Sequence, residues 1–538
     1  MTASSDFDQK INNQQKQIKH LAEIGLALSA EKNISKLLEM IVDEAKDLSN
    51  ADAGTLYKVD DDKLHLSFEI MQNDSMKIRM GGTSGNKITL PKVPLYINGR
   101  QNHSNVSSYT AITGEIINIP DVYKASGFDF TGPRKYDATT GYRSKSMLVI
   151  PMKNHENDII GVLQLLNAKN IKTGKVVSFP VKDVNLIASL ASQAAIVLTN
   201  TQLIQDLKNL FYSFIKSIAT AIDEKSPYTG GHVRRVVFLT MRIAEEINKS
   251  HDGPFKDIYF NEDEIEELRL AAWMHDVGKI TTPEHVVDKS TKLETIFDRI
   301  FLIETRFNLI AGLIKKIYLK QEIELLKNEE NSRDKIKRIE QDLGDELKML
   351  YNELDFIKAC NKTKEFMNDD KIKKIKNIAK KTYLLNNEEH YYLTEDEVKN
   401  LCIREGSLTE EERKIIENHA EMTLKILKQI PFPKKLANVP KYAASHHEKL
   451  DGSGYPSGLT SKEMPFQLRI MAIADIFEAL TAKDRPYKEL TKLSHAIKIM
   501  ECMKKDKHID PDIYDLFIKK RLFYDYAKKE MFSEQIDM

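Results

Sequence analysis

The sequence predicts a multidomain protein: an α+β domain, a connecting coiled-coil helix, and an all-α domain interrupted by an inserted helical hairpin. Three observations point to this fold class. The chain has 538 residues, more than one hydrophobic core usually supports. Apolar and polar residues alternate in parts of the first 180 residues, as in half-buried strands. Later segments instead repeat apolar residues every three or four positions, as helices do.

We expect five segments along the chain. They are an N-terminal helix with the α+β domain (1–180), the connecting helix (181–223), the first part of the all-α domain (224–290), the insertion (291–404) and the second part of the all-α domain (405–538).

The composition limits the classes of partner. Lys plus Arg and Asp plus Glu each number 80, so no net charge attracts the chain to a nucleic-acid polymer or an acidic membrane. The three cysteines follow no CxxC spacing, which argues against a disulfide framework or a zinc ribbon. The polar N-terminus lacks a signal core, and nowhere do about 18 apolar residues run together. We expect a cytoplasmic protein without membrane association.

The α+β domain is predicted to start with a helix and to continue with two β-hairpins. From about Gln9 to Ala45, apolar residues recur at helical spacing. Residues 53–70, AGTLYKVDDDKLHLSFEI, alternate around an acidic turn, and residues 146–170 hold two apolar runs around the polar turn Lys153 to Asp158. Helices beside an antiparallel sheet make an α+β domain.

The connecting segment 181–223 contains no proline or glycine. Its seam alternates spacings of four and three and consists of Ile196, Asn200, Leu203, Leu207, Leu210 and Phe214. Such a seam predicts a parallel coiled coil between two copies, with a polar residue, Asn200, that fixes the register. The alternative is an amphipathic helix that packs on its own domain.

A second heptad pattern occupies the insertion. Its first arm has the seam Ile296, Ile300, Ile303, Phe307, Ile310, Ile314 and Ile317. After the polar break KNEENSR, the second arm has the seam Ile336, Ile339, Leu343, Leu347, Leu350, Leu354 and Ile357. We expect an antiparallel helical hairpin with arms of roughly 45–50 Å, at about 1.5 Å per residue. Its role is expected to be structural or partner-binding.

Residues able to bind a metal lie on both sides of the insertion. HHEKLDGSGYP, from His446 to Pro456, places two imidazoles beside carboxylates and a glycine-rich turn. Asp475 stands in the apolar stretch RIMAIADIFEALTA, where a free carboxylate is costly to bury unless a cation compensates it. The other candidates are His232, His275, Asp276 and His419. A lone histidine is more often a surface residue, but five histidines and two aspartates together indicate a metal site.

Three motifs occur in order along the chain: HDVGK from His275 to Lys279, HHEKLDGSGYP, and RPYK from Arg485 to Lys488. Together with the upstream histidine and the downstream aspartate, they resemble the HD superfamily of metal-dependent phosphohydrolases. The similarity is to its HD-GYP branch, the cyclic-di-GMP phosphodiesterases. It covers about 210–290 and 405–503, and the three motifs in this order are highly specific. The region between looks like an insertion.

The resemblance implies a ligand set. His232, His275, Asp276 and Asp475 match the quartet that holds one ion. His419, His446 and His447 match the ligands of a second ion, and Asp276 bridges the two. A pair of ions held in this way activates a water and holds phosphoryl oxygens.

The resemblance also implies roles for residues beside the metals. Lys279 is expected to act in catalysis by contacting a phosphate, and Arg485 and Lys488 match basic residues near the second phosphate. A turn made of Gly454, Tyr455 and Pro456 is expected to shape the substrate site. Tyr228 stands where many members carry a glutamate for a third metal, so we expect two divalent ions per chain, iron or manganese.

The N-terminal domain resembles a GAF domain, a small-ligand sensor. The matching stretches are TGEIINIPDVY, DATTGYRSKSMLVIPM, and GVLQLLNAKN followed by FPVKD. The last corresponds to four residues of cyclic-nucleotide-binding members, here Asn167, Lys169, Phe179 and Asp183. The acid that usually follows is Val184, so the match to that subset is incomplete. The expected ligand is a small molecule or cyclic nucleotide; the alternative is a dimerisation module without a ligand.

The resemblances imply a dimeric, GAF-regulated phosphodiesterase that hydrolyses cyclic di-GMP to linear pGpG, with further cleavage to GMP left open. One alternative is a phosphodiesterase for another cyclic dinucleotide, such as 3',3'-cGAMP, because metals and basic residues hold phosphates without reading bases. Another is a non-catalytic cyclic-di-GMP receptor that signals through the helical insertion.

Overall fold

The computed structural model describes residue 19 and residues 22–225, 230–328, 333–363, 366–483 and 490–538. The chain divides into two compact units, Met1–Phe211 and Tyr212–Met538. Each unit is described by itself.

The first unit is built on an eight-stranded sheet in the strand order β3-β2-β1-β9-β8-β7, with β4 on β2 and β10 on β9. All the pairings are antiparallel, as the two predicted hairpins require. The strands are β1 (Ala51–Val59), β2 (His65–Asn73), β3 (Ile78–Gly81), β4 (Val93–Pro94), β7 (Ile117–Ile119), β8 (Met147–Lys153), β9 (Ile159–Lys169) and β10 (Val176–Val177). A separate two-stranded sheet pairs β5 (Tyr96–Ile97) with β6 (Arg100–Gln101).

Two hydrophobic clusters lie in this unit. One contains sheet residues together with α2 (Ile34–Ser49) and the first half of α5 (Val181–Asp223). The other contains sheet residues with α3 (Val106–Thr113) and the loop before α4 (Thr131–Thr140). Residues 9–18, 20 and 21 of the predicted helix from Gln9 to Ala45 lie outside the described residues, and the described part is interrupted at 31–33. The reason is Asn33, whose side chain accepts a hydrogen bond from the backbone of Lys36 and so begins a new helix.

Helix α5 is both a core helix and an exposed one. Its first half buries residues between Ile187 and Leu198 in the core of the first unit. The predicted seam then becomes exposed, with exposed fractions of 53% at Leu203 and 69% at Leu210. Among the described residues, α5 alone is long and apolar enough to cross a membrane, a criterion that core helices of soluble proteins also meet.

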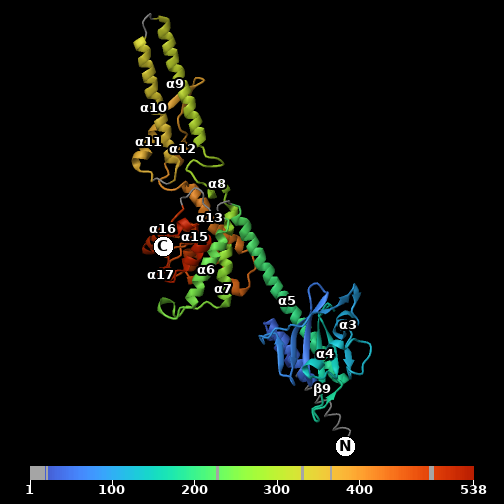
Figure 1. Ribbon diagram of the computed structural model, residues 1–538. Coiled ribbons are helices and arrows are strands. Elements are labelled where there is room, and N and C mark those ends of the chain that lie inside the picture. Colours follow the sequence, from blue (N-terminus) through green and yellow to red (C-terminus); the bar gives the residue numbers. More distant parts are fainter. Residues whose placement is uncertain (1–18, 20–21, 226–229, 329–332, 364–365, 484–489) are drawn as a thin grey trace. The chain divides into compact units, whose positions relative to one another are not determined.

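The second unit is predominantly helical (Figure 1). Together with the antiparallel sheet of the first unit, this confirms the predicted α+β domain followed by a helical region. The helices outside the insertion are α6 (His232–Asn248), η1 (Gly253–Phe255), α7 (Glu262–Met274), η2 (Val277–Thr281), α8 (Glu284–Val287), α13 (Glu410–Leu427), η3 (Lys434–Leu436), α14 (Val439–Ala444), α15 (Phe466–Thr481), α16 (Leu493–Lys505), α17 (Pro511–Lys519), α18 (Leu522–Glu530) and η4 (Ser533–Gln535).

The insertion contains the expected helical hairpin, α9 (Ile300–Asn328) and α10 (Arg333–Asn361), which lie side by side (Figure 1). Its seam includes Phe307 and Leu354, both buried. Two seam assignments were wrong: Ile296 precedes α9 and is 93% exposed, and Ile317, within α9, is 56% exposed.

The insertion has more elements than the predicted hairpin. The additional elements are α11 (Asp369–Ala379), β11 (Thr382–Leu385), β12 (Glu388–Tyr391) and α12 (Glu395–Leu401). Residues of α11 and α12 share one hydrophobic cluster with α9 and α10. The two strands pair across Asn386 and Asn387, both at positive φ, which is the turn chemistry that asparagine tolerates.

The start and the end of the insertion are tied together. Lys289 is buried, and its Nζ lies 2.8 Å from both carboxylate oxygens of Glu412 and 2.9 Å from Oδ1 of Asn400. The Ser407 hydroxyl donates to the carbonyl of Lys289 at 2.8 Å. The Lys292 Nζ donates to the carbonyl of Ile403 at 2.7 Å. The insertion therefore leaves and rejoins the helical domain at one place.

Deletion of 291–404, with a short flexible linker between Ser290 and Glu405, is expected to leave a folded protein that binds metal as the parent does. The physical reason is that the insertion has its own core and contains none of the proposed ligands. Metal content per folded chain checks this. A second deletion, of residues 291–379 alone, is the comparison. It keeps Leu393 and Leu401 but removes the rest of the insertion's core that buries them, so both leucines become exposed. Loss of metal from the folded 291–404 deletion would contradict the expectation.

Candidate metal centre

The first ligand pair lies where a helix ends. Helix α7 begins with a capping box between Asn261 and Glu264, which fixes its start. It ends at Met274, His275 is its C-cap residue, and Asp276 precedes the short helix η2. Both side chains are almost completely buried, with exposed fractions of 0% and 4%. A helix end buried among apolar residues such as Met274 thus delivers an imidazole and a carboxylate together.

Gly278 of the HDVGK motif brings this pair against α13. A Cβ at this position would lie 1.9 Å from the carbonyl oxygen of His419 and 2.6 Å from the backbone nitrogen of Thr423. The backbone of Gly278 donates to the Thr423 hydroxyl at 2.9 Å, and that hydroxyl donates to the carbonyl of His275 at 3.0 Å. The motif needs glycine here because no side chain fits between η2 and α13.

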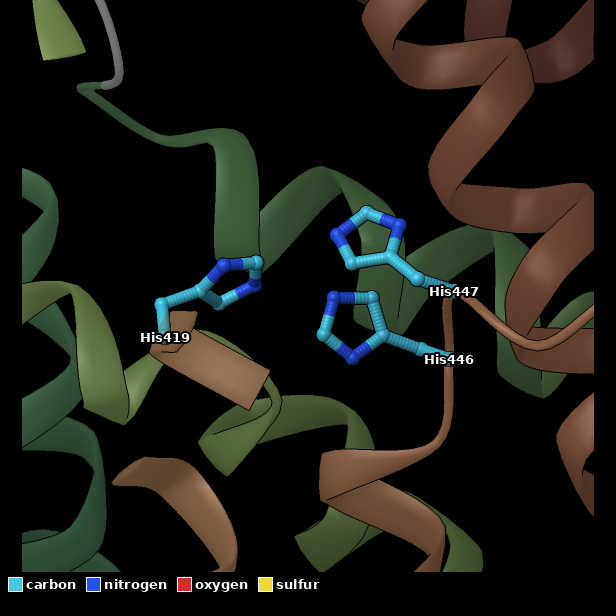
Figure 2. A group of neighbouring side chains, drawn as sticks. All are labelled: His419, His446 and His447. Atoms are coloured by element: carbon cyan, nitrogen blue, oxygen red, sulfur yellow. The ribbon is translucent and has the colours of Figure 1, made fainter. Parts of the chain in front are cut away.

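The adjacent histidines His446 and His447 follow the short helix α14, and Figure 2 shows their rings turned toward that of His419. Ligand atoms of the three lie within 4.8 Å of one another. The next residue, Glu448, is buried and accepts hydrogen bonds from the backbones of Ser457 at 2.7 Å and Leu459 at 2.8 Å. This carboxylate closes the loop that contains Gly454, Tyr455 and Pro456.

The GYP turn lies beside the histidines. A Cβ on Gly454 would lie 2.4 Å from the backbone nitrogen of Lys449, so the turn folds back tightly on its own start. The ring of Tyr455 lies 4.8 Å from the ring of His447, with the two planes tilted by 33°. Pro456 follows in the same turn, between Tyr455 and the loop anchored by Glu448. The turn therefore forms part of the wall around the histidine cluster.

Asp276 lies between two groups of ligands. Its Oδ2 is 3.4 Å from Nε2 of His232 and 3.4 Å from Nε2 of His275. Its Oδ1 faces the other group, 3.5 Å from Nε2 of His419 and 3.9 Å from Nε2 of His446. One carboxylate thus presents one oxygen to each group, as a bridging ligand does.

Asp475 completes the first group from α15. Its Oδ1 lies 3.3 Å from Nε2 of His232 and 3.8 Å from Nε2 of His275. Bond lengths of about 2.0–2.2 Å to a divalent ion place neighbouring ligand atoms about 3 Å apart, close to these separations. The structure therefore brings together all seven predicted ligands, from both sides of the insertion.

The donor set fits divalent metal ions. Asp276 Oδ1, His419 Nε2 and His446 Nε2 are buried and have no hydrogen-bond partner among the described residues. Such orphaned polar atoms are rare because each forfeits its solvation. The Nδ1 atoms of both histidines are already held, by the carbonyls of Ile416 and Ala443. Only the Nε2 lone pairs remain, and they face the bridging carboxylate.

Electrostatics prepare these groups to bind a cation. Burial lowers the pKa of His447 to about 4. Burial and the neighbouring histidines hold the pKa of His446 well below its usual value, and burial lowers that of His419. Burial alone would raise the pKa of Asp276, but Lys279 and the histidines hold it well below the ordinary value. At neutral pH the second group is uncharged imidazole and the bridge is carboxylate, the forms that metals bind.

Lys279 lies at this centre, and its Nζ is 2.6 Å from Asp276 Oδ2. Of the three basic residues predicted to contact phosphate, Lys279 is the one that belongs to the described residues. Arg485, Lys488 and Tyr228 lie outside the described residues.

Sequence reasoning missed Glu478 and Arg235, which lie behind His232. Nδ1 of His232 is 2.5 Å from Oε2 of Glu478, and Nε of Arg235 donates to Oε1 of Glu478 at 2.7 Å. The available signal was a second acid three residues after Asp475 in the apolar stretch ADIFEALT.

The four predicted GAF-ligand residues have other partners. Asn167 is buried and bonds to the backbones of Arg143 and Lys145, and Lys169 pairs with Asp52. Phe179 is in the core, and Asp183 is in the first turn of α5.

None of these four residues lines the cavity of about 310 Å³ in the first unit. Its walls carry aromatic, thioether and amide side chains such as Tyr57, Met147 and Gln164.

Comparison with known families agrees with this architecture. Residues 33–198 match the GAF domain, and residues 229–356 and 395–513 each match the HD domain. The chain is 37% identical over 137 residues to a probable cyclic di-GMP phosphodiesterase of Vibrio cholerae, covering 24% of this chain and 30% of that protein.

Two further relatives are similar over shorter stretches. The chain is 40% identical over 111 residues to the 3'3'-cGAMP-specific phosphodiesterase 3 of V. cholerae, covering 20% of this chain and 23% of the relative. It is 35% identical over 119 residues to a cyclic di-GMP phosphodiesterase of Thermotoga maritima, covering 22% and 32%. The chain thus spans less than a third of the length of these curated relatives. Along this chain, one match to the GAF domain is therefore followed by two matches to the HD domain.

Proposed function

We propose that this protein is a cytoplasmic, metal-dependent phosphodiesterase that hydrolyses cyclic di-GMP to linear pGpG and is regulated by its GAF domain. The observation that carries the proposal is that the two carboxylate oxygens of Asp276 face different groups of candidate ligands. Oδ2 faces one group and Oδ1 faces the other. Iron or manganese suits the mixed imidazole and carboxylate ligands. No disulfide joins the three cysteines, which agrees with a reducing compartment.

The chain's own residues would bind and orient the phosphodiester. Two divalent ions at this site would activate a water and hold phosphoryl oxygens. Lys279 carries a positive charge beside the bridge, within reach of a phosphate held there. The Tyr455 ring offers a flat wall next to His447, on which a base or ribose can pack.

Replacement of Lys279 by Ala is expected to keep both ions and to lower the rate of hydrolysis on the order of 100-fold. The reason is the loss of a preorganised positive charge beside the phosphate, since Lys279 contacts the bridging carboxylate but is not itself a ligand. Initial rates at saturating substrate, measured beside metal content, check this. Lys434→Ala, at an exposed lysine of η3, serves as the control. Loss of metal from Lys279→Ala would show instead that the lysine supports the site.

The test of the proposed function is incubation of the full chain, loaded with Mn²⁺ or Fe²⁺, with cyclic di-GMP, 3',3'-cGAMP and cyclic di-AMP. Chromatographic separation of the products should show linear pGpG formed fastest. Preferred cleavage of 3',3'-cGAMP would support the second candidate, which the relatives favour to a similar degree, at 40% against 37% identity. If the metal-loaded chain binds cyclic di-GMP but releases no linear product, the protein is a non-catalytic cyclic-di-GMP receptor instead of an enzyme.

Regulation by the GAF domain is supported by the end of α5. Its last residue, Asp223, is buried and accepts a hydrogen bond from the backbone of Val233 at 3.4 Å, next to the ligand His232. Just after α5, the Lys225 Nζ donates to the carbonyl of Ile280 at 3.0 Å and to that of Thr282 at 2.8 Å. Ile280 directly follows Lys279, and Thr282 lies two residues further along the chain. A shift of α5 would therefore move two segments of the metal centre.

The exposed seam of α5 is expected to make the protein a dimer. Light scattering on the parent should give twice the chain mass of 61.7 kDa. Changing Leu203, Leu207 and Leu210 to Ser should give the single mass, because these three exposed leucines would supply the apolar contact between copies. Ile171→Ser, at an 83% exposed site outside the seam, is the control and should remain dimeric. An unchanged mass for the triple variant would remove this seam as the interface.

A further inference from the structure

His232 is held differently from the other histidines of the metal centre. His275, His419 and His446 each direct Nδ1 at the carbonyl three residues earlier, those of Ala272, Ile416 and Ala443. In each case a helix supplies that carbonyl. His232 is the first residue of α6, so its own helix supplies no such acceptor. Its Nδ1 needs a partner from elsewhere in the fold.

Glu478 is that partner. Its side chain is completely buried, and Oε2 lies 2.5 Å from Nδ1 of His232. With Glu478 accepting at Nδ1, the Nε2 atom of His232 faces Asp276 and Asp475, at 3.4 Å and 3.3 Å. A carboxylate at one ring nitrogen fixes the tautomer and orientation of the ring and strengthens the other nitrogen as a ligand.

Arg235 makes this buried carboxylate tolerable. Its Nε donates to Oε1 of Glu478 at 2.7 Å, and the arginine is itself 4% exposed. A buried carboxylate without a cationic partner would be costly. The guanidinium therefore allows Glu478 to stay ionised behind the histidine.

The arrangement is reciprocal between two helices. On α6 the ligand His232 and the guanidinium of Arg235 are three residues apart, and on α15 the ligand Asp475 and Glu478 are three residues apart. Residues at this spacing share one helix face. The faces of α6 and α15 therefore meet through two ligands and one ion pair, which couples the packing of the helices to the first metal position.

We propose that Glu478, supported by Arg235, is a positioning residue for His232 and sets the affinity of the first metal position, a proposal that rests on the metal centre of the proposed function. The first position then depends, through His232, on a carboxylate supplied by another helix, whereas His275, His419 and His446 are held by the backbone of their own helices. Substitution of Glu478 should weaken one ion selectively.

The test measures Mn²⁺ affinity of the full chain by titration calorimetry. A His447→Ala background lacks a ligand of the second ion, so the remaining binding event reports the first. In that background Glu478→Gln, which keeps size but not charge, should weaken Mn²⁺ binding about 10- to 100-fold. Thr481→Val is the matched control, because it removes another buried polar group one turn further along α15. The Thr481 hydroxyl donates to backbone carbonyls of α15 and lies 3.5 Å from the Tyr526 hydroxyl.

A second variant separates the effect on metal binding from the destabilisation that an uncompensated buried charge would cause. Glu478→Gln combined with Arg235→Gln removes both buried charges, so no guanidinium is left without its carboxylate, and it should show the same weakened binding. An affinity equal to that of the background in either folded variant, or an equal loss in Thr481→Val, would overturn the proposal. Absence of hydrolysis by the metal-loaded parent would count against the proposed function alone, since the affinity comparison needs no turnover.

Discussion

Replacement of Asp276 by Asn is expected to remove both ions and to lower turnover by more than about 1,000-fold, beyond the effect of one lost charge contact. The side chain keeps its size but loses the charge and one of its two acceptor oxygens. Both oxygens are in use, since Oδ2 faces His232 and His275 while Oδ1 faces His419. A substitution at the bridge therefore affects both positions, whereas a substitution at any one histidine affects one.

Metal content by elemental analysis, measured beside turnover, distinguishes these cases. Asp276→Asn should carry less than one ion per chain, and His446→Ala or His447→Ala should retain about one. Asp506→Asn, at an exposed residue that ends α16, should match the parent. If Asp276→Asn keeps two ions, the bridging assignment is wrong even if activity is lost.

Gly278→Ala is expected to lower the free energy of unfolding by about 1–3 kcal/mol or more and to release the second ion. The added methyl would lie 1.9 Å from the carbonyl oxygen of His419, and it would meet backbone rather than a flexible side chain. Helix α13 must move away from η2 to make room. His419 would then move away from Asp276, and the Gly278–Thr423 hydrogen bond would lengthen.

Chemical denaturation of the metal-free proteins measures the loss of stability, and metal content measures the lost ion. Gly312→Ala is a matched control within α9, because no atom lies within 4 Å of the added Cβ. An open helical position should gain roughly 0.5–1 kcal/mol from the same change. Equal stability of Gly278→Ala and the parent would show that the close approach of η2 and α13 is not needed.

Four of the seven candidate ligands lie in two short stretches whose other residues also have a reason to be there. HDVGK places two ligands beside a glycine that lets η2 touch α13, and HHEKLDGSGYP places two more beside Glu448, which closes the loop. Local chemistry of this kind can be read along the chain.

The role of Glu478 could not be read in the same way. Its function depends on α6 lying against α15, and the two residues it contacts are more than 240 positions away. An acid in an apolar helix signals a compensating partner but not which one.

In the first unit the residue types matched, and the structure gives two of the side chains partners elsewhere in the fold. Asn167 has φ of 57° and uses its amide to hold the backbone around Arg143, so its side chain is occupied by the fold. Lys169 is held by Asp52, on the first strand. Both partners come from distant parts of the chain, and no local sequence pattern predicts them. The β11–β12 hairpin was missed for a different reason, since its Asn-Asn turn was readable but lay inside a stretch dominated by helical spacing.

The joint at the base of the insertion has a consequence for how such chains diversify. Because Ser407 bonds directly to Lys289, the two ends of the inserted segment emerge at neighbouring points of the surface. A segment that starts and stops at one point can be exchanged without rerouting the chain. Recombination or protein design could therefore replace the helical hairpin by another module while the candidate metal ligands on either side keep their positions.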